Sequence, residues 1–294
     1  MKLPEIVKSN ELVQASFTLS LVEQRLILLA IVEARETGLG IDANTHLTVS
    51  AGLYAKHFGL SLSAAYKALG DAAKSLFERQ VTFFDVNVAT GQPRKRITRW
   101  VSEISYLDGS SCVQLIFAPS IVPEITRLEA NFTSYDLEQV SNLQSAYAVR
   151  LYELLIKWRS VGKTPVFKVE EFRGQLGVGL DEYTAMGNFK ARVLDLAVAQ
   201  VCAHTDLIVS YEQVKSGRTI IGFQFKFKAK KTAIDVNKPT KKQAGKAAIK
   251  GISPSDMSAF IAKHRHPTES SDEAYDRLMQ ESKDGAVFTM SHTD

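Results

Sequence analysis

Asn188 and Arg192 lie four residues apart at the start of an amphipathic stretch, residues 187–205. On a helical wheel of ~100° per residue they converge with Asp195 and Ala199 on one side. An apolar set converges on another side: Phe189, Val193, Leu196, Ala197 and Val201. Arginine can donate two hydrogen bonds to guanine, and asparagine can pair in the same way with adenine. The pattern predicts a helix that presents Asn188 and Arg192 to base edges, with an ion pair between Arg192 and Asp195 as the alternative.

Other residues near this stretch could hold a sugar-phosphate backbone. Lys190 lies on a flank ~160° from Arg192, so we expect it to meet a phosphate rather than the same base pair. Lys215 and Arg218 lie in a KSGR turn, where phosphate contacts would add affinity without sequence information. Further candidates for backbone contact lie before the amphipathic stretch: Arg173, Tyr183 and Thr184.

The elements that would position these residues follow the order of a winged helix-turn-helix. KVEEFRGQL, residues 168–176, predicts a short helix, and Gly177 and Gly179 predict a turn after it. The amphipathic helix then leads into DLIVSYEQV, the KSGR turn and TIIGFQFKFK, which predict a hairpin with a basic tip. Helix, turn, longer helix and hairpin in this order predict DNA binding.

The first half of the chain repeats this order. The segment that starts at Leu47 can be laid against the segment that starts at Phe167, and each has a short strand, a short helix, a longer helix and a β-rich exit. A long helix is predicted before each segment, over about residues 21–36 and 144–160. Ser20 and Glu23 have the spacing of a capping box, which marks the start of the first long helix. The sequence therefore predicts an α+β protein with two tandem winged-helix domains.

The longer helix of the first half carries fewer candidates for DNA contact. Its apolar stripe is predicted to be buried: Leu62, Tyr66, Leu69, Ala73, Leu76 and Phe77. Lys67 and Lys74 share the opposite face with Asp71 and Glu78, so this face is charge-balanced and suits phosphate contact better than base reading. The next turn, ATGQPRKR, predicts a wing tip where Arg94, Lys95 and Arg96 grip phosphate, with an ordinary solvated hairpin as the alternative.

Length and charge support this division. At 294 residues the chain exceeds the size at which one core stops growing, so two domains are expected. Residues 1–144 carry 13 Lys and Arg against 15 Asp and Glu, and residues 145–231 carry 14 against 8. The positive charge therefore lies where the winged-helix pattern is clearest, as phosphate binding requires.

We place the domains at residues 1–140, 141–231 and 232–294. The last segment begins with the lysine-rich KTAIDVNKPTKKQAGKAAIKG and has few large apolar residues, which predicts a basic linker and a flexible tail. The longest apolar run, Leu26 to Val32, is too short to span a bilayer. The N-terminus lacks a signal-like apolar core, and Cys112 and Cys202 lie in separate halves, so a reducing cytoplasm is expected.

Enzymatic patterns are poorly represented. Neither Gly-Lys pair has a glycine five residues earlier, so the chain lacks the phosphate-binding loop of an ATPase. His264-Arg265-His266 could suggest a metal-dependent DNA nickase, but the pair lies in a polar tail with a charged central residue. Cysteine and histidine do not occur with zinc spacing. We expect no catalytic residue, metal or cofactor.

Several of these segments resemble the Rep-3 family of plasmid replication initiators. The opening IVKSNELVQASFTLSLVEQRLILLAI is similar to that family's N-terminal signature. LYELLIKW, FKARVLD and TDLIVSYEQVKSGRTIIGFQF are similar to segments of its second domain. The resemblance covers about residues 5–228 in the same order, and the segment after residue 231 is not part of it.

This resemblance implies a bacterial protein that binds repeated sites, the iterons, in the double-stranded DNA of a plasmid origin. It implies initiation by a monomer, repression of its own gene by a dimer joined through the first domain, and recruitment of the host initiator and helicase. Host chaperones are a further candidate partner. It assigns base reading to residues 189–193, where many members have a third basic residue in place of Ala191. A strand edge within residues 100–117 is one candidate dimer surface. A transcription factor without a replication role and a rolling-circle nickase are the alternative functions.

Overall fold

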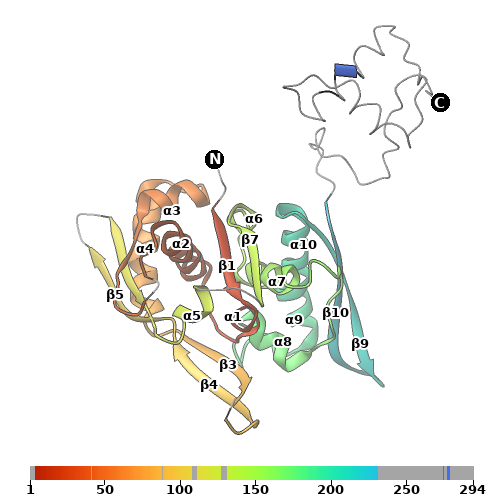
Figure 1. The fold of residues 1–294 in the computed structure, drawn as a ribbon. Helices are drawn as coiled ribbons and strands as arrows, with labels where there is room; N and C mark the ends of the chain where they lie inside the picture. The colour runs from red at the N-terminus through yellow and green to blue at the C-terminus, as the bar shows by residue number, and fades with distance from the viewer. Residues whose placement is uncertain are drawn as a thin grey trace, which may run out of the picture. The chain divides into compact units, whose positions relative to one another are not determined.

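The structure is a computed structural model that describes residues 4–40, 42–87, 89–107, 111–126 and 131–230, with Ala274, Arg277 and Leu278. The chain divides into two units, Met1–Lys231 and Thr232–Asp294. Both winged helices belong to the first unit, coloured red to light blue in Figure 1. Apart from Ala274, Arg277 and Leu278, the predicted linker and flexible tail lie outside the described residues, and so do His264 and His266.

The chain begins with a strand and two helices that form the centre of the first half. β1 (Glu5–Ser9) leads into α1 (Asn10–Gln14) and then α2 (Leu21–Thr37). The predicted capping box is present: the Ser20 hydroxyl accepts a hydrogen bond from the Glu23 amide, and the Glu23 carboxylate accepts one from the Ser20 amide. The apolar run of α2 is buried, as its composition predicts. α2 ends at Gly38, whose positive φ of 71° suits glycine.

The first winged helix follows α2. β2 (Leu47–Ser50), α3 (Ala51–Phe58) and α4 (Leu62–Leu76) form in the predicted order, and Gly59 ends α3 in the left-handed conformation. β2 then pairs with β6 (Cys112–Phe117), which also pairs with β5 (Val101–Leu107). The sheet order β2-β6-β5 makes β5–β6 the wing of this domain.

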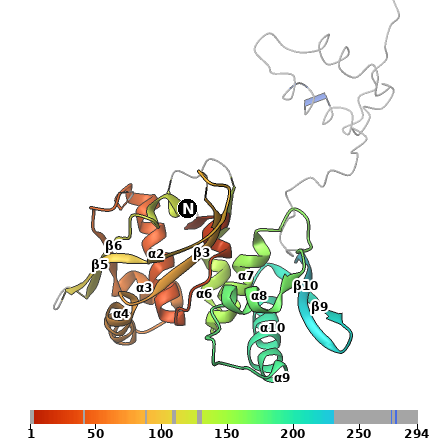
Figure 2. The ribbon, with the colours of Figure 1, turned by 90° about the horizontal axis from the view of Figure 1, so that it is seen from below.

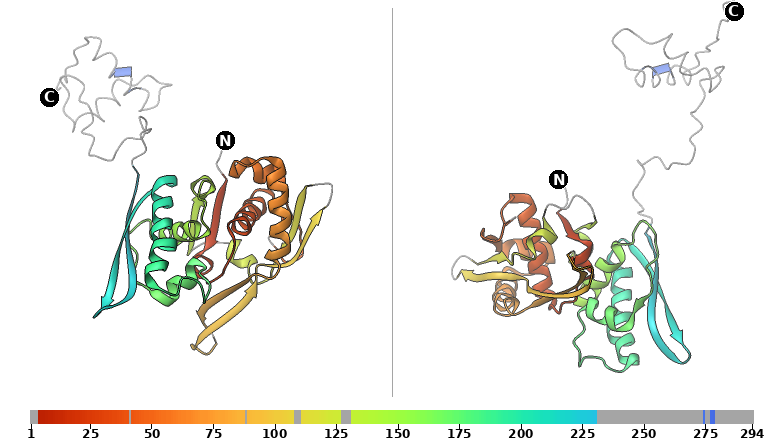
Figure 3. Two further views of the ribbon diagram at one scale, coloured as in Figure 1. Left: turned by 180° about the vertical axis from the view of Figure 1, so that it is seen from behind. Right: turned by 60° about the horizontal axis from the view of Figure 1, so that its bottom comes forward.

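A separate hairpin is inserted between α4 and this wing. β3 (Gln80–Val86) and β4 (Pro93–Arg99) form their own two-stranded sheet. The prediction of a wing tip at residues 89–96 was therefore wrong, because this hairpin is the first β-rich segment after the helix but pairs with neither strand of the wing. Figures 1 and 3 show it projecting from the body of the first half.

Three short elements and a helix connect the halves. They are α5 (Val122–Ile125), β7 (Phe132–Asp136), α6 (Glu138–Ser141) and α7 (Ala146–Ile156). β7 pairs antiparallel with β1, so the two ends of the first half meet in one small sheet. The proposed domain boundary near residue 140 remains a prediction.

The second winged helix has the same topology without the insertion. Its elements are β8 (Phe167–Lys168), α8 (Val169–Leu176), α9 (Met186–Phe189), a π-helical segment (Lys190–Leu194), α10 (Asp195–His204), β9 (Leu207–Ser216) and β10 (Thr219–Ala229). The sheet order β8-β10-β9 matches β2-β6-β5. Figure 2 shows α10 and the β9–β10 hairpin side by side.

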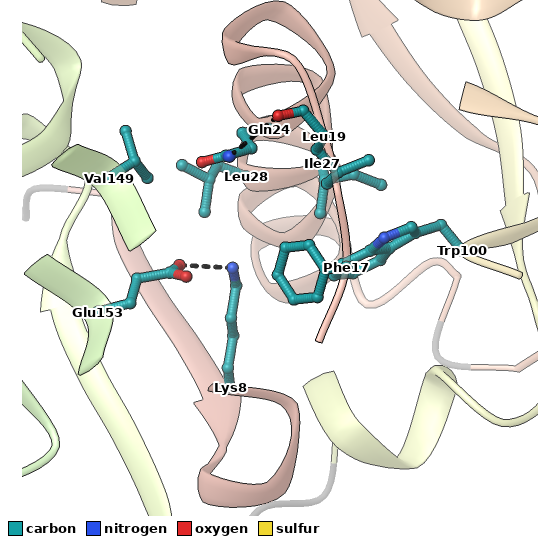
Figure 4. Close-up of a pocket in the computed structure, with 9 residues that line it drawn as sticks. All are labelled: Lys8, Phe17, Leu19, Gln24, Ile27, Leu28, Trp100, Val149 and Glu153. Carbon is teal, nitrogen blue, oxygen red and sulfur yellow. Dashed lines mark hydrogen bonds and ion pairs between the residues drawn. The ribbon is translucent and has the colours of Figure 1, made fainter. Parts of the chain in front are cut away.

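A buried charged cluster lies where β1 and β7 meet α7 (Figure 4). Lys8 Nζ lies 2.6 Å from Glu153 Oε1, and Arg150 lies 2.6 Å from Glu153 Oε2. The Tyr135 hydroxyl donates a third hydrogen bond to Glu153 at 2.6 Å. Burial alone would raise the pKa of Glu153, but Lys8 and Arg150 outweigh it and lower that pKa to about 2.

The end of α1 and the chain just after it also pack closely on α7 and on the second winged helix. Arg150 donates hydrogen bonds to the carbonyls of Val13 and Ala15, at 2.9 and 3.0 Å. A Cβ at Gly177 would lie 2.7 Å from the Phe17 carbonyl oxygen, and φ is +82° there, so glycine is required on both counts. These contacts place residues 13–17 directly against the second half.

Candidate nucleic-acid interface

The predicted recognition helix is a helix over residues 186–204 that contains a π segment. α9 and α10 are joined by the π turn Lys190–Leu194, in which the Asp195 amide donates to the Lys190 carbonyl. A π turn bonds residue i to i+5, so it acts as one extra residue in an α-helix.

The π turn changes which residues face the core. Phe189, Val193, Ala197 and Val201 are buried as predicted, and Leu194 is buried with them. Leu196, predicted to be buried, is 45% exposed. The prediction was wrong at Leu196 because the wheel assumed an uninterrupted α-helix.

The core spacing explains why the helix bulges. Phe189, Leu194, Ala197 and Val201 are separated by five, three and four residues. In a plain α-helix Val201 would lie ~120° from Phe189, whereas one inserted residue brings it to ~20°. The π turn therefore keeps one apolar face on the core over the whole helix.

Aromatic side chains hold the helix against the sheet. Phe172 of α8 contacts Phe189 edge-on at 6.4 Å between ring centroids, and it contacts Phe223 and Phe225 of β10 at 6.0 and 5.5 Å. Phe189 and Phe223 also meet, at 6.0 Å. Aromatic pairs add to the energy of area burial, so these contacts give the recognition helix a rigid base.

Asn188 and Arg192 are exposed at the N-terminal end of the helix. In the part of the chain that the structure describes, Arg192 forms no ion pair. Asp195, its alternative partner, instead accepts a hydrogen bond from the Tyr211 hydroxyl at 2.6 Å. The two candidate base readers therefore project their polar groups into solvent.

The loop before the helix is fixed by Arg173. Its guanidinium donates to the Tyr183 carbonyl at 3.0 Å and to the Glu182 carbonyl, and it lies 5.0 Å from the centre of the Phe189 ring. Tyr183 is half-buried with a positive φ of 47°, and Thr184 is exposed. Arg173 therefore holds the loop that leads into the helix, a structural role that the sequence did not indicate.

The basic residues in and near the helix occupy two environments. Lys215 and Arg218 are exposed on either side of the turn between β9 and β10, where Gly217 has a φ of 62°. Lys190 is half-buried inside the π turn. The tip of this wing is therefore basic and free of packing, as the KSGR motif predicts.

On α4 of the first half, Lys67 and Lys74 are exposed, and Lys74 lies 3.9 Å from Asp71. The predicted apolar stripe is buried at Leu69, Ala73 and Leu76 but exposed at its ends: Leu62 is 59%, Tyr66 36% and Phe77 37% exposed. Tyr66 packs edge-on against Tyr106 of β5, beside an open groove between α4 and β5. The prediction of a fully buried stripe was therefore wrong at Leu62, Tyr66 and Phe77.

Arg94, Lys95 and Arg96 lie on β4 and not at a hairpin tip. Arg94 forms a bidentate pair with Asp85 across the hairpin, at 2.8 and 2.9 Å. Arg96 lies 3.4 Å from Asp85 and 4.3 Å from the centre of the Phe83 ring. Only Lys95 points to the opposite, exposed face. All three cations therefore lie on the strand and not at the predicted wing tip, and Asp85 on the opposite strand pairs with two of them, Arg94 and Arg96.

Within the residues that the structure describes, no group of three or more His, Cys, Asp or Glu side chains is arranged to hold a metal ion. The helices in the same residues are all too short or too polar to cross a membrane.

The chain matches two protein-family models. The model described as "Initiator Replication protein, WH1" matches residues 5–156, and "Initiator Rep protein, WH2" matches residues 168–227. Together they cover most of the described structure, and both denote winged-helix domains.

Individual proteins are also similar to this chain. A replication initiation protein of Escherichia coli is 27% identical over 183 residues, which is 62% of this chain and 53% of that protein. The chain thus matches about half the length of that relative. The WH1 domain of a replication protein isolated from a multiple sclerosis patient is 52% identical, with a TM-score of 0.33, over 38% of this chain and 83% of that one.

The Pi initiator protein, solved in complex with iteron DNA, shares the fold. It superposes with a TM-score of 0.58 and 20% identity over 79% of this chain and 99% of that one. The predicted architecture of two tandem winged-helix domains is confirmed.

Proposed function

The chain belongs to the family of initiator replication proteins, a family of DNA-binding initiators, and on this premise we propose that it binds the iterons of a plasmid origin and promotes origin opening. In this proposal a monomer engages each repeat. The second winged helix, within residues 141–231, recognises the sequence, and residues 1–140 mediate dimerisation and auxiliary DNA contacts. The fold shared with an initiator that was solved on iteron DNA supports the proposal.

The observation that carries the proposal is the exposed N-terminal end of the recognition helix. Asn188 and Arg192 are exposed there on a helix held by Phe172 and Phe223. Rigid support matters because side chains that read bases must project from a backbone whose position is fixed. We assign base contacts to Asn188 and Arg192.

Backbone contacts are assigned to residues around this helix and on the first half. The proposed set is Tyr183, Thr184, Lys190, Lys215, Arg218, Lys67, Lys74 and Lys95, and Arg173 acts by positioning the loop. Arg94 and Arg96 could join the set only by exchanging Asp85 for a phosphate.

A footprint on the non-coding DNA of the protein's own plasmid, beside a salt titration, tests the proposal. We expect protection of several evenly spaced direct repeats and an affinity that falls steeply with salt, because phosphate contacts release counterions. Protection of a single inverted repeat at a promoter would contradict the iteron assignment and favour a transcriptional repressor without a replication role.

Replication itself needs a separate test. The gene supplied in trans should sustain a plasmid that carries only the origin repeats, through recruitment of the host initiator and helicase, with chaperones as further partners. Autorepression would use a dimer, for which β5 at the edge of its sheet is one candidate surface. Nicking of supercoiled origin DNA in Mg²⁺ or Mn²⁺ would contradict the assignment to non-catalytic initiators.

A further inference from the structure

Leu196 is a large apolar residue of the recognition helix that is exposed to solvent. Its side chain is 45% exposed, whereas Phe189, Val193, Leu194, Ala197 and Val201 are fully buried. Exposed leucines are common on protein surfaces, so exposure alone does not indicate a function. The position of Leu196 on the helix makes it informative.

The π turn places Leu196 on the face of the base readers. In a plain α-helix Leu196 would lie ~80° from Asn188, but with one inserted residue it lies only ~20° away. Asn188, Arg192 and Leu196 then follow one another along a single stripe of exposed side chains.

The same turn removes a carboxylate from this stripe. In a plain α-helix Asp195 would lie ~20° from Asn188, and the insertion moves it to ~120°. There the Tyr211 hydroxyl donates to it at 2.6 Å, and Tyr211 is itself packed against Phe223 at 5.7 Å. A tyrosine hydroxyl is protonated at neutral pH, and burial and the bond to Asp195 raise the pKa of Tyr211 further above its ordinary value. On the face of the base readers, the π turn thus places the apolar side chain of Leu196 where an acidic side chain, Asp195, would otherwise repel DNA.

On this geometry we propose that Leu196 is a specificity-determining residue that contacts the C5 methyl group of a thymine in the repeat. The thymine methyl is the apolar group that base pairs present in the major groove, so it is the partner that an exposed leucine on a base-reading face would select. The inference rests on the proposed function, because it requires this helix to enter the major groove.

The helix geometry also limits where that thymine lies. Arg192 and Leu196 are separated by ~6 Å along the helix axis at 1.5 Å per residue. This distance corresponds to about two base steps of 3.4 Å. We therefore expect the thymine within about two base pairs of the base that Arg192 contacts.

Deoxyuridine substitution tests the proposal, because it removes only the methyl group. The probe is a duplex carrying one footprinted repeat, in which each thymine in turn is replaced by deoxyuridine. At one position we expect the unaltered protein to bind about fourfold more weakly, the equivalent of one buried methylene-sized group. Leu196→Ala should bind the thymine duplex more weakly by a similar or larger factor and should not respond to deoxyuridine at that position.

Ile208→Ala is the matched control. Ile208 is 46% exposed, like Leu196, but it lies at the end of β9 opposite Lys228, far along the hairpin from its tip. This variant should keep both the affinity and the deoxyuridine response of the unaltered protein. Circular dichroism and the melting temperature would establish that each variant is folded.

Two results would overturn the proposal while leaving the proposed function intact. One is specific binding that no thymine-to-deoxyuridine change weakens. The other is a Leu196→Ala variant that remains as sensitive to deoxyuridine as the unaltered protein. If no repeat is bound specifically at all, the proposed function itself fails, so the two failures are distinguishable.

Discussion

The two winged helices share one topology but present different surfaces. In each, a short strand pairs with the second strand of a hairpin, and two helices lie between them. The recognition helix of the second half carries exposed Asn188 and Arg192, which form no ion pair with any residue that the structure describes, whereas α4 of the first half carries Lys74 beside Asp71. Fold order alone therefore does not distinguish the two helices, whereas the charge and exposure of a few side chains do.

The two wings also differ in their basic residues, and again the second half carries the exposed ones. β9 and β10 meet at a turn flanked by Lys215 and Arg218, whereas the chain between β5 and β6, residues 108–111, contains no lysine or arginine. The first half has in addition the inserted β3–β4 hairpin, where Arg94 pairs with Asp85 and Arg96 pairs with Asp85 and Glu124. This contrast supports the proposal that the first half serves protein contact and auxiliary DNA contact, and the second serves recognition.

The largest effect is expected at the cluster that joins the halves. Glu153→Ala leaves Lys8 and Arg150 buried without their counter-charge, which should cost about 3–5 kcal/mol in the free energy of unfolding. Urea denaturation measures this cost. Glu212→Ala removes an exposed pair with Lys226 and should have a much smaller effect, because solvent screens an exposed ion pair. Equal costs for the two variants would mean that the halves do not depend on this cluster.

The lowered pKa of Glu153 predicts how the stability of the protein changes with pH in acid. The pKa of Glu153 is lowered to about 2 in the folded chain from its ordinary 4.5, so its contribution to stability is present above pH 4.5. That contribution should be lost as pH falls from 4.5 towards 2. Denaturation midpoints measured over this range should fall steeply for the unaltered protein and more gently for Glu153→Gln. Parallel curves would contradict the assignment.

A smaller effect is expected on DNA binding, and it distinguishes the recognition helix from α4. Arg192→Ala should cost about 1–3 kcal/mol on the cognate repeat and relax discrimination at one base pair. Lys67→Ala, the corresponding change on α4, should weaken binding less and should not alter sequence preference. Binding to a panel of single-base variants of the repeat measures both. Equal losses for Arg192→Ala on specific and random DNA would show that it contacts phosphate.

The smallest effect is expected at the wing. Lys215→Ala should weaken binding to all sequences and reduce the slope of log affinity against log salt by about one phosphate contact. Lys95→Ala on the inserted hairpin provides the comparison. If its salt slope changes as much as that of Lys215→Ala, the hairpin of the first half contacts DNA as closely as the wing of the second.

Local features of the fold could be predicted from the sequence alone. The Ser20–Glu23 capping box and the turn at Gly177 depend on residues within a few positions of each other, and both occur as predicted. The order of helices and strands and the basic KSGR tip belong to the same group. These features need no information about distant parts of the chain, because hydrogen bonding and backbone conformation in a single turn determine them.

Tertiary structure decided the features that involve distant partners. The wing of the first half is β5–β6 because β2 pairs with β6, and periodicity cannot reveal which strand a distant strand will choose. Asp85 pairs with Arg94 and Arg96 because the pairing of β3 with β4 brings these residues together across the hairpin. The exposure of Leu62 and Tyr66 likewise depends on which elements pack against α4, and some of these come from distant parts of the chain.

The recognition helix combines both kinds of information. Its apolar pattern predicted a helix with the correct polar end, but the spacing of Phe189, Leu194, Ala197 and Val201 fits one core face only with an inserted residue. The sequence by itself therefore determined that a helix forms and that Asn188 and Arg192 stand at its exposed end. Packing against Phe172 and Phe223 decided that the helix bulges and that Leu196 replaces Asp195 beside them, because burying a continuous apolar face outweighs the cost of one irregular turn.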